Sequence, residues 1–123
     1  FKKVDDQLRL IDADTTGTTA TVIYIREEYG SPIVHCANVG DSRAVLYHNQ
    51  KAKRISYDHK GSDHQEMLRV RDEGGIIMRN RVGGQLAVTR ALGDHHLKTE
   101  GVSNKPYYQK EILEPGETYY IVM

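Results

Sequence analysis

The sequence is poor in the features that stabilise secreted, zinc-bound or membrane-spanning proteins. Its single cysteine, Cys36, cannot form an internal disulfide, and without any CxxC pair a zinc ribbon is excluded. A reducing compartment is therefore expected, with a cytoplasmic or nuclear location. No apolar run approaches the roughly 20 residues that a transmembrane helix needs, and no signal-peptide pattern is present, so no membrane partner is expected.

Neither sign of charge is in excess, because 17 Lys and Arg balance 17 Asp and Glu. Without a net field, or a basic run interleaved with aromatic residues, we expect no nucleic-acid partner. A chain of 123 residues is one domain or part of one, and it can bury a real core. Because the sequence starts at Phe1 and stops inside a strand-like run, residues 119–123, we expect a piece of a longer polypeptide. Its unpaired sheet edge could then recruit another chain without physiological meaning.

Motifs for several common chemistries are also missing. There is no GxGxxG and no P-loop. Residues 40–42, Gly-Asp-Ser, echo a hydrolase serine, but no GxSxG elbow exists and no Asp stands three residues before a His. Known ligand-pair spacings are absent, which argues against a zinc site built from His35, Cys36, His59, His64, His95 and His96. We expect most of these histidines on the surface, with His59 hydrogen-bonded to nearby backbone.

The hydrophobic pattern predicts about seven short antiparallel strands, with two or three helices set apart from them. This is typical of an α+β protein with a sheet or sandwich core, not of alternating βαβ units. The expected elements are an amphipathic helix end at 1–13, a strand covered on both faces at 18–25, a charged hairpin loop at 26–32, a short strand at 51–55, a strand from 76, a tight turn at 83–84, a short helix or turn at 89–93, an irregular segment at 94–108 and a turn at 115–116.

A further helix is predicted after Ser62, because the Ser62 hydroxyl and the Gln65 amide fit a capping box. Gly74 is a suitable residue for ending this helix. We assign its buried side to Met67, Leu68 and Val70, and its solvated side to Gln65, Glu66, Arg69 and Asp72.

The stretch 37–46 joins two apolar, β-prone runs, residues 33–39 and 44–47, through a tight polar connection. We predict a hairpin in which Gly40 takes a positive φ and Asp41 is presented at the tip. A carboxylate in that position can bind a cation or orient water. The same residues also make ordinary turns, because Gly, Asp and Ser are common turn residues for backbone reasons alone.

Five short motifs share the order and spacing of one known family. They are TGTTA at 16–20, ANVGDSRA at 37–44, DHK at 58–60, ExxRVxxxGG at 66–75 and LAVTRALGD at 86–94, with Lys98 following. Together they resemble the PP2C-type metal-dependent protein Ser/Thr phosphatases. The resemblance runs from residue 16 to the end of the chain.

That resemblance implies an antiparallel β-sandwich flanked by helices, the four-layer αββα arrangement, here incomplete. Residues 1–123 are then one partial phosphatase domain, with a flap-like helix and hairpin region at 62–94. The family also implies a cluster of Mn²⁺ or Mg²⁺ ions at one sheet edge, where a bridging water attacks phosphoserine or phosphothreonine of a phosphoprotein substrate. Hard cations suit carboxylate ligands, and they lower the pKa of bound water.

The chain departs from the family pattern in its acidic residues. It contains no Asp-Gly dipeptide, so the family's core metal-binding loops and the His that protonates the leaving alcohol are missing. No catalytic residue is therefore assigned. Only Asp41 matches a metal-contacting position, at the weaker third site, so metal binding by this chain is expected to be weak or absent. We expect no phosphoester turnover by the 123 residues alone.

The flap-like region supplies the remaining candidates. Arg79 and Arg81 could lie near a phosphopeptide, or they could be solvated charges on a hairpin. Arg90 and Asp94 are expected to form a local structural pair. Two other interpretations stay open: a non-catalytic pseudophosphatase or regulatory binding module of the same fold, and an unrelated α+β binding domain.

Overall fold

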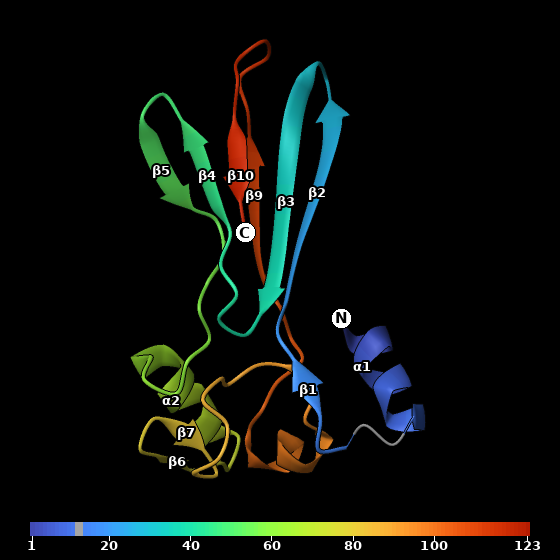
Figure 1. Cartoon of the computed structure of the whole chain (residues 1–123), viewed down its shortest axis with the longest axis vertical. Helices are drawn as coiled ribbons and strands as arrows, with labels where there is room; N and C mark the ends of the chain where they lie inside the picture. Colours follow the sequence, from blue (N-terminus) through green and yellow to red (C-terminus); the bar gives the residue numbers. More distant parts are fainter. Residues whose placement is uncertain (12–13) are drawn as a thin grey trace.

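Two three-stranded antiparallel sheets form one end of the molecule, and the helices and two short ladders gather at the other (Figure 1). This computed structural model describes residues 1–11 and 14–123. The helices are α1 (Lys2–Leu8), η1 (Arg9–Ile11), α2 (His64–Asp72) and η2 (His95–Glu100). The strands are β1 (Gly17–Thr18), β2 (Ala20–Glu28), β3 (Ser31–Val39), β4 (Val45–His48), β5 (Lys51–Arg54), β6 (Ile77–Met78), β7 (Arg81–Val82), β8 (Leu92–Gly93), β9 (Tyr107–Ile112) and β10 (Tyr120–Val122).

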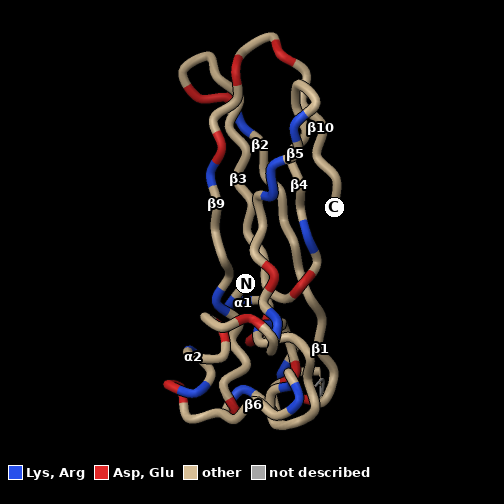
Figure 2. The backbone as a smooth tube through the Cα atoms, turned by 90° about the vertical axis from the view of Figure 1, so that its left-hand side faces the viewer, with Lys and Arg blue, Asp and Glu red and all other residues tan. Residues whose placement is uncertain are grey.

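The two larger sheets have the strand orders β2–β3–β9 and β10–β4–β5, and every pairing is antiparallel. They stand side by side when the molecule is turned by 90° (Figure 2). Alternate residues of β3 and β4 face the space between the sheets, as a strand's period of two requires. The core there is formed by Val34, Cys36, Ala44, Leu46, Ile55 and Leu113. A second core, formed by Val70, Val82, Ala91, Leu97 and Val102, packs beneath α2. The fold is mixed α+β, as expected.

The hairpin predicted for residues 33–47 is wrong. β3 pairs with β2 and β9, whereas β4 pairs with β5 and β10, so the two strands lie in different sheets. Residues 40–44 carry the chain across from one sheet to the other. Both apolar runs bury one face in the same core, and local sequence spacing does not distinguish this crossing from a hairpin.

The strand expected at 18–25 forms as β2, but it is not covered on both faces. β2 is an edge strand, and Val22 and Tyr24 are 49% and 58% exposed. The loop expected at 26–32 is also too long. β2 continues to Glu28 and β3 begins at Ser31, so the turn between them consists of residues 29–30. Charged side chains suit an edge hairpin of this kind, since they discourage pairing with other chains.

Several local predictions are confirmed, and others shift. A strand occupies 51–54, Gly74, Gly83 and Gly84 have positive φ, and a turn at 115–116 precedes β10. Residues 89–93 end in β8, which pairs with β1, rather than in a helix. The segment 94–108 contains η2 and the start of β9. Asp63, not Ser62, caps α2, accepting a hydrogen bond from the backbone N–H of Glu66.

The helices lie beyond the ends of the larger sheets and do not cover their faces in the part of the chain described (Figure 1). α1 confirms the expected helix, but not through its apolar stripe, since Val4 is 48% exposed and Ile11 is 70% exposed. Its buried Asp5 instead accepts hydrogen bonds from the Gly93 N–H and Asn104 Nδ2, each at 2.7 Å, and lies 3.3 Å from Lys98 Nζ. Residues 12–13, part of the same prediction, lie outside the described residues. Within the described residues, no helix has the length and apolar character needed to span a bilayer.

Replacing Ile55 by alanine tests the core between the sheets. Ile55 is 1% exposed, so Ile55→Ala leaves a cavity and should lower the free energy of unfolding by about 2–5 kcal/mol. In the 123-residue chain Ile112→Ala is the matched control, because Ile112 is 68% exposed there and its truncation should change stability by no more than about 0.5 kcal/mol. Urea denaturation followed by circular dichroism measures both, and equal losses would contradict a core at this position.

Candidate functional site

The connection between β3 and β4 holds Asp41 where the sheets meet the helical end of the molecule. The Asp41 side chain is 39% exposed, and its Oδ2 lies 3.7 Å from Lys60 Nζ. The carboxylate therefore lies at a sheet margin within reach of solvent, as the sequence predicts. It is outside both hydrophobic cores.

Gly40 fixes the path of this connection. Its φ is +87°, a left-handed conformation that glycine adopts without steric cost. A Cβ at this position would lie 2.3 Å from Thr19 Cγ2, far inside van der Waals contact. The backbone before Asp41 therefore rests directly on the chain leading into β2, and only glycine fits there.

The Gly40 carbonyl accepts hydrogen bonds from two fully buried residues. His59 donates twice, from its backbone N–H at 3.0 Å and from Nδ1 at 3.1 Å, and Asn38 Nδ2 donates at 3.3 Å. The carbonyl partner requires the proton to be on Nδ1 of His59. This confirms the expected backbone contact of His59, and it fixes the peptide group that carries Asp41.

Ser42, on the other side of Asp41, is held by the strand opening that includes the TGTTA motif. Its hydroxyl and the Thr19 hydroxyl share a 2.7 Å hydrogen bond, and the Thr21 hydroxyl donates to the Ser42 carbonyl at 2.7 Å. The partner of the Ser42 hydroxyl is thus a threonine. A serine paired in this way is a structural brace, which agrees with the rejection of a hydrolase serine.

Asp58 is the counter-ion of the basic residues around the connection. Its carboxylate binds Arg43 Nη2 at 2.6 Å and Arg54 Nη2 at 2.9 Å, and Lys60 Nζ lies 3.8 Å away. The hydrogen bond from Arg43 lowers the pKa of Asp58 against the opposing effect of burial, and Arg54 lowers it further. The two sequence motifs GDSR and DHK are therefore joined by an ion pair.

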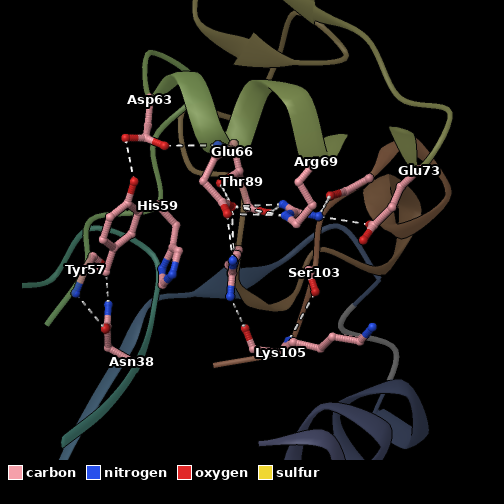
Figure 3. Close-up of polar contacts among 12 residues, drawn as sticks. Asn38, Tyr57, His59, Asp63, Glu66, Arg69, Glu73, Thr89, Ser103 and Lys105 are labelled. Carbon is pink, nitrogen blue, oxygen red and sulfur yellow. Dashed lines mark hydrogen bonds and ion pairs between the residues drawn. The ribbon is translucent and has the colours of Figure 1, made fainter. Parts of the chain in front are cut away.

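A buried ion cluster around Glu66 joins α2 to the LAVTR segment (Figure 3). Glu66 is 3% exposed, and it binds Arg90 Nη2 at 2.6 Å, Arg69 Nη2 at 3.0 Å and the Thr89 hydroxyl at 2.5 Å. Burial raises the pKa of Glu66, but the hydrogen bonds from Arg90, Arg69 and Thr89 outweigh it and lower the pKa to about 2. The backbone N–H of Thr89 also donates to the His59 carbonyl at 3.0 Å, so the cluster supports the residues that hold Gly40.

The Glu66 cluster overturns three expectations. Glu66 and Arg69 were assigned to a solvated face of α2, yet Glu66 is buried and the Arg69 side chain is only 20% exposed. Arg90 pairs with Glu66 rather than with Asp94. Asp94 instead lies over Gly17, where an added Cβ would meet its Oδ2 at 1.9 Å, and burial raises the pKa of its carboxyl. The predictions failed because a charged side chain can be buried when its partners surround it, and the sequence pattern of one helix does not show where those partners lie.

Tyr57 links the Asp41 connection to the start of α2 (Figure 3). Asn38 Oδ1 accepts from the Tyr57 N–H at 3.0 Å, Asn38 Nδ2 donates to the Tyr57 carbonyl at 2.7 Å, and the Tyr57 hydroxyl donates to Asp63 Oδ2 at 2.7 Å. The hydrogen bond to Asp63, with burial, raises the pKa of Tyr57 to about 12. Neither Tyr57 nor Asn38 was singled out from the sequence. Asn38 lies in a strand at a position where an apolar residue is normal. A polar residue in such a position is the signal in the sequence that could have indicated its role.

Comparison with known proteins shows to which family the chain belongs. The family model described as Protein phosphatase 2C matches residues 1–123, the whole chain. The chain belongs to the PP2C family. "Protein phosphatase 2C homolog 1" of Schizosaccharomyces pombe is 44% identical over 112 residues, which cover 89% of this chain and 32% of that protein. "Protein phosphatase 1B" of Homo sapiens is 34% identical over 135 residues, covering 100% of this chain and 27% of that protein.

Solved structures share the fold. A Caenorhabditis elegans sex determining protein matches with a TM-score of 0.80 and 26% identity, over 94% of this chain and 29% of that chain. Serine-threonine phosphatase 2C from Toxoplasma gondii matches with a TM-score of 0.75 and 20% identity, over 94% and 43% respectively, which shows the fold alone. The chain spans about a third or less of the length of the two curated PP2C relatives above.

Membership of the PP2C family implies that the complete enzymes depend on Mg²⁺ or Mn²⁺. Within residues 1–11 and 14–123, no group of three or more His, Cys, Asp or Glu is arranged to hold a metal ion. In the part of the chain that the structure describes, the Asp41 carboxylate has the Lys60 ammonium as its ion-pair partner. One accessible carboxylate does not make a divalent-cation site, because such ions take six or more oxygen ligands. The described residues therefore do not by themselves fit the metal cluster of the family.

The flap-like region leaves both of its candidate arginines at the surface, whereas the expectation that most histidines lie there holds only in part. Arg79 and Arg81 are exposed on the β6–β7 turn, where Arg81 donates to the Gln85 carbonyl at 2.7 Å, and the turn lies at the far end of the molecule from the larger sheets. His59 and His95, in contrast, are buried. Burial also raises the pKa of the Cys36 thiol, which is inert in the core.

The buried His59 should make stability depend on pH between about 6.5 and 4. Burial, with Arg90 nearby, lowers the pKa of His59 to about 4 from 6.5. The folded chain binds fewer protons in this window, so acidification favours unfolding, and full stability is present above pH 6.5. The loss should reach about 3 kcal/mol by pH 4. Glu66, with its lowered pKa, adds to the loss only at lower pH, below about 4.5.

Urea unfolding at several pH values measures this dependence. The variant His59→Gln lacks the titrating group, so its stability should be lower at pH 7 but nearly flat between pH 6.5 and 4.5. The exposed His96 gives the control variant His96→Gln, which should keep the slope of the unmodified chain. A slope that survives in His59→Gln would show that another group is responsible.

Proposed function

We propose that the chain is part of a metal-dependent phosphatase that hydrolyses phosphoserine and phosphothreonine in phosphoproteins by means of a metal-bridged water, and that Asp41 is one of its metal ligands. The observation that carries the assignment of Asp41 is the restraint of the Gly40 carbonyl by buried His59 and Asn38 beside an accessible carboxylate. Such a restraint limits the freedom of a ligand before the cation arrives, which favours binding.

The remaining carboxylates of the metal centre come, in this proposal, from parts of the polypeptide outside these 123 residues. Two-metal hydrolysis requires several acids that converge on the ions and on the attacking water. Because the chain spans about a third or less of two curated relatives, there is ample length for those acids elsewhere. The 123 residues alone are expected to be inactive. The complete protein is expected to be cytoplasmic or nuclear.

In the complete domain we expect the four-layer αββα arrangement, with helices on the outer faces of the two larger sheets. The outer face of β2–β3–β9 supports this, because it leaves exposed the apolar or aromatic residues Val22, Tyr24, Tyr108 and Ile112. A sheet face of that kind is normally covered in a folded domain. Residues 1–123 would then form one partial domain, with residues 62–94 as the flap.

Hydrolysis of p-nitrophenyl phosphate, with and without Mn²⁺, tests the proposal. The complete polypeptide should show Mn²⁺-dependent turnover, and Asp41→Ala should raise the Mn²⁺ concentration for half-maximal activity by at least roughly tenfold. Asp6→Ala, at an exposed carboxylate paired with Lys2, is the control and should change nothing.

Three outcomes would contradict the proposal. Metal-dependent turnover by the 123 residues alone would show that they hold a sufficient metal site. An unchanged Mn²⁺ requirement in Asp41→Ala would remove Asp41 from the metal centre. If the complete polypeptide shows no turnover at all, the non-catalytic binding module of the same fold becomes the better interpretation.

Arg79 and Arg81 are proposed to contact the phosphopeptide from the flap. Their exposure around the β6–β7 turn leaves the Arg79 guanidinium accessible to an anionic peptide, and among the described residues one hydrogen bond, to the Gln85 carbonyl, holds that of Arg81. Arg79→Ala and Arg81→Ala should each raise KM for a phosphothreonine peptide in the complete enzyme by about fivefold, the worth of an exposed ion pair, with little change in kcat. Arg26→Ala, on the exposed edge strand β2, should leave KM unchanged. If all three variants keep the KM of the unmodified enzyme, Arg79 and Arg81 are solvated charges.

A further inference from the structure

Helix α2 presents two different faces. Glu66 and Val70 point into the molecule, where Glu66 holds the buried ion cluster and Val70 belongs to the second core. The opposite face carries four residues at positions i, i+3, i+4 and i+7, which form a single stripe on a helix. They are His64, Met67, Leu68 and Arg71. The assignment of Met67 to the buried side of the helix is therefore wrong, since Met67 is 39% exposed.

This outer stripe forms one wall of a groove, and the segment leading into β6 forms the other. The groove has a volume of about 370 Å³, and it is lined by His64, Met67, Leu68, Arg71, Gly75, Ile76 and Ile77. We name it the α2–β6 groove. Met67 is 39% exposed and Ile76 is 60% exposed, so the apolar walls are open to solvent.

The apolar surface continues past the groove. Ile76 also lines an adjacent hollow together with Met78, which is 54% exposed, and Leu97. Met67, Ile76 and Met78 thus form a strip of exposed large apolar side chains on α2, on the segment leading into β6 and on β6 itself. Contiguous apolar surface on a protein usually marks an interaction site, and methionine adapts its shape to different apolar partners.

The described lining residues of the α2–β6 groove include one charged side chain, and its charge is positive. Its lining includes the guanidinium of Arg71 and the imidazole of His64, and none of its described lining residues is acidic. Among the described residues, the ion-pair partner of Arg71 is Asp72, at 3.6 Å with both side chains 71% exposed, a contact worth little. Arg69 on the inner face is by contrast fully engaged with Glu66, Glu73 and the Gly101 carbonyl. Arg71 is therefore free to receive a carboxylate from outside.

We propose that the α2–β6 groove docks a short segment of a partner protein in which one large apolar side chain is flanked by Asp or Glu. The apolar side chain enters between Met67, Leu68 and Ile76, and the flanking carboxylate binds Arg71. An apolar anchor in a pocket with a charged contact at its rim is a common mode of peptide recognition. The site uses neither Asp41 nor any metal ion, so it stands independently of the phosphatase chemistry.

Methyl NMR of the 123-residue chain, with ¹³C-labelled methionine methyl groups, tests the docking. The probe is the peptide acetyl-Gly-Asp-Leu-Asp-Gly-amide, and the two matched peptides replace Leu by Ala or both Asp by Lys. The probe should shift the Met67 resonance saturably and bind at least about fivefold more tightly than either matched peptide. Met123 lies at the end of the chain beyond β10, and its resonance should not move.

Variants at the rim and wall of the groove separate charge from apolar contact. Arg71→Glu should reverse the preference so that the Lys peptide binds more tightly, and Ile76→Asp should abolish the Met67 shift for every peptide. Tyr29→Asp, at a fully exposed aromatic residue in the β2–β3 turn, is the control and should bind like the unmodified chain. Unchanged dispersion of the methyl spectrum shows that each variant is folded.

Three results would overturn the proposal. These are no saturable Met67 shift with the acidic Leu peptide, equal affinity for the acidic and basic peptides, and a preference that Arg71→Glu does not reverse. A further contradiction would be a Met67 methyl that is already inaccessible in the complete polypeptide, because the groove would then be filled by the protein's own residues. None of these results depends on whether the complete protein hydrolyses phosphoesters.

Discussion

The restraint of the Gly40 carbonyl is the contact on which the surroundings of Asp41 depend. Three donors from Asn38 and His59 converge on one oxygen, and Thr19 blocks any side chain at Gly40. Both donor residues are themselves supported, Asn38 by its hydrogen bonds with Tyr57 and His59 by the Thr89 N–H, which donates to the His59 carbonyl. The support therefore passes from the sheet connection to α2 and the Glu66 cluster. A loop that carries an accessible carboxylate is thus held by buried polar groups rather than by apolar packing, which suits a residue that must stay both exposed and fixed.

This arrangement gives a physical reason why five separated motifs occur together. TGTTA supplies Thr19, which braces Gly40 and Ser42, DHK supplies His59 and the counter-ion Asp58, and LAVTR supplies Thr89 and Arg90. Where β1 pairs with β8, a Cβ on Gly17 would meet the Asp94 carboxylate, and a Cβ on Gly93 would lie 2.2 Å from the Thr16 carbonyl oxygen. A change in one motif therefore disturbs a partner in another, because buried polar networks tolerate few unmatched groups.

The sequence predicted the fold class, most strands and the accessible position of Asp41 at a sheet margin, because these depend on local period and turn chemistry. It failed where a long-range partner decides. Local spacing predicts a hairpin between β3 and β4. The structure instead pairs β3 with β2 and β9, and β4 with β5 and β10, and these pairings depend on the arrangement of each whole sheet. Glu66 was assigned to solvent because Arg90, its strongest partner, lies 24 residues away. In the same way Asn38 and Tyr57 gained a role only once their elements came together.

The attachment of α1 has a consequence for how the chain opens. The helix is held by the Asp5 carboxylate, and Val4 and Ile11 remain largely in water. Its detachment therefore exposes little additional nonpolar area. An opening of that kind changes the heat capacity and the denaturant sensitivity very little, since both scale with newly exposed surface. The amide protons of α1 would then exchange with solvent at nearly the same rate in dilute and in moderate urea, while those of β3 and β4 accelerate steeply.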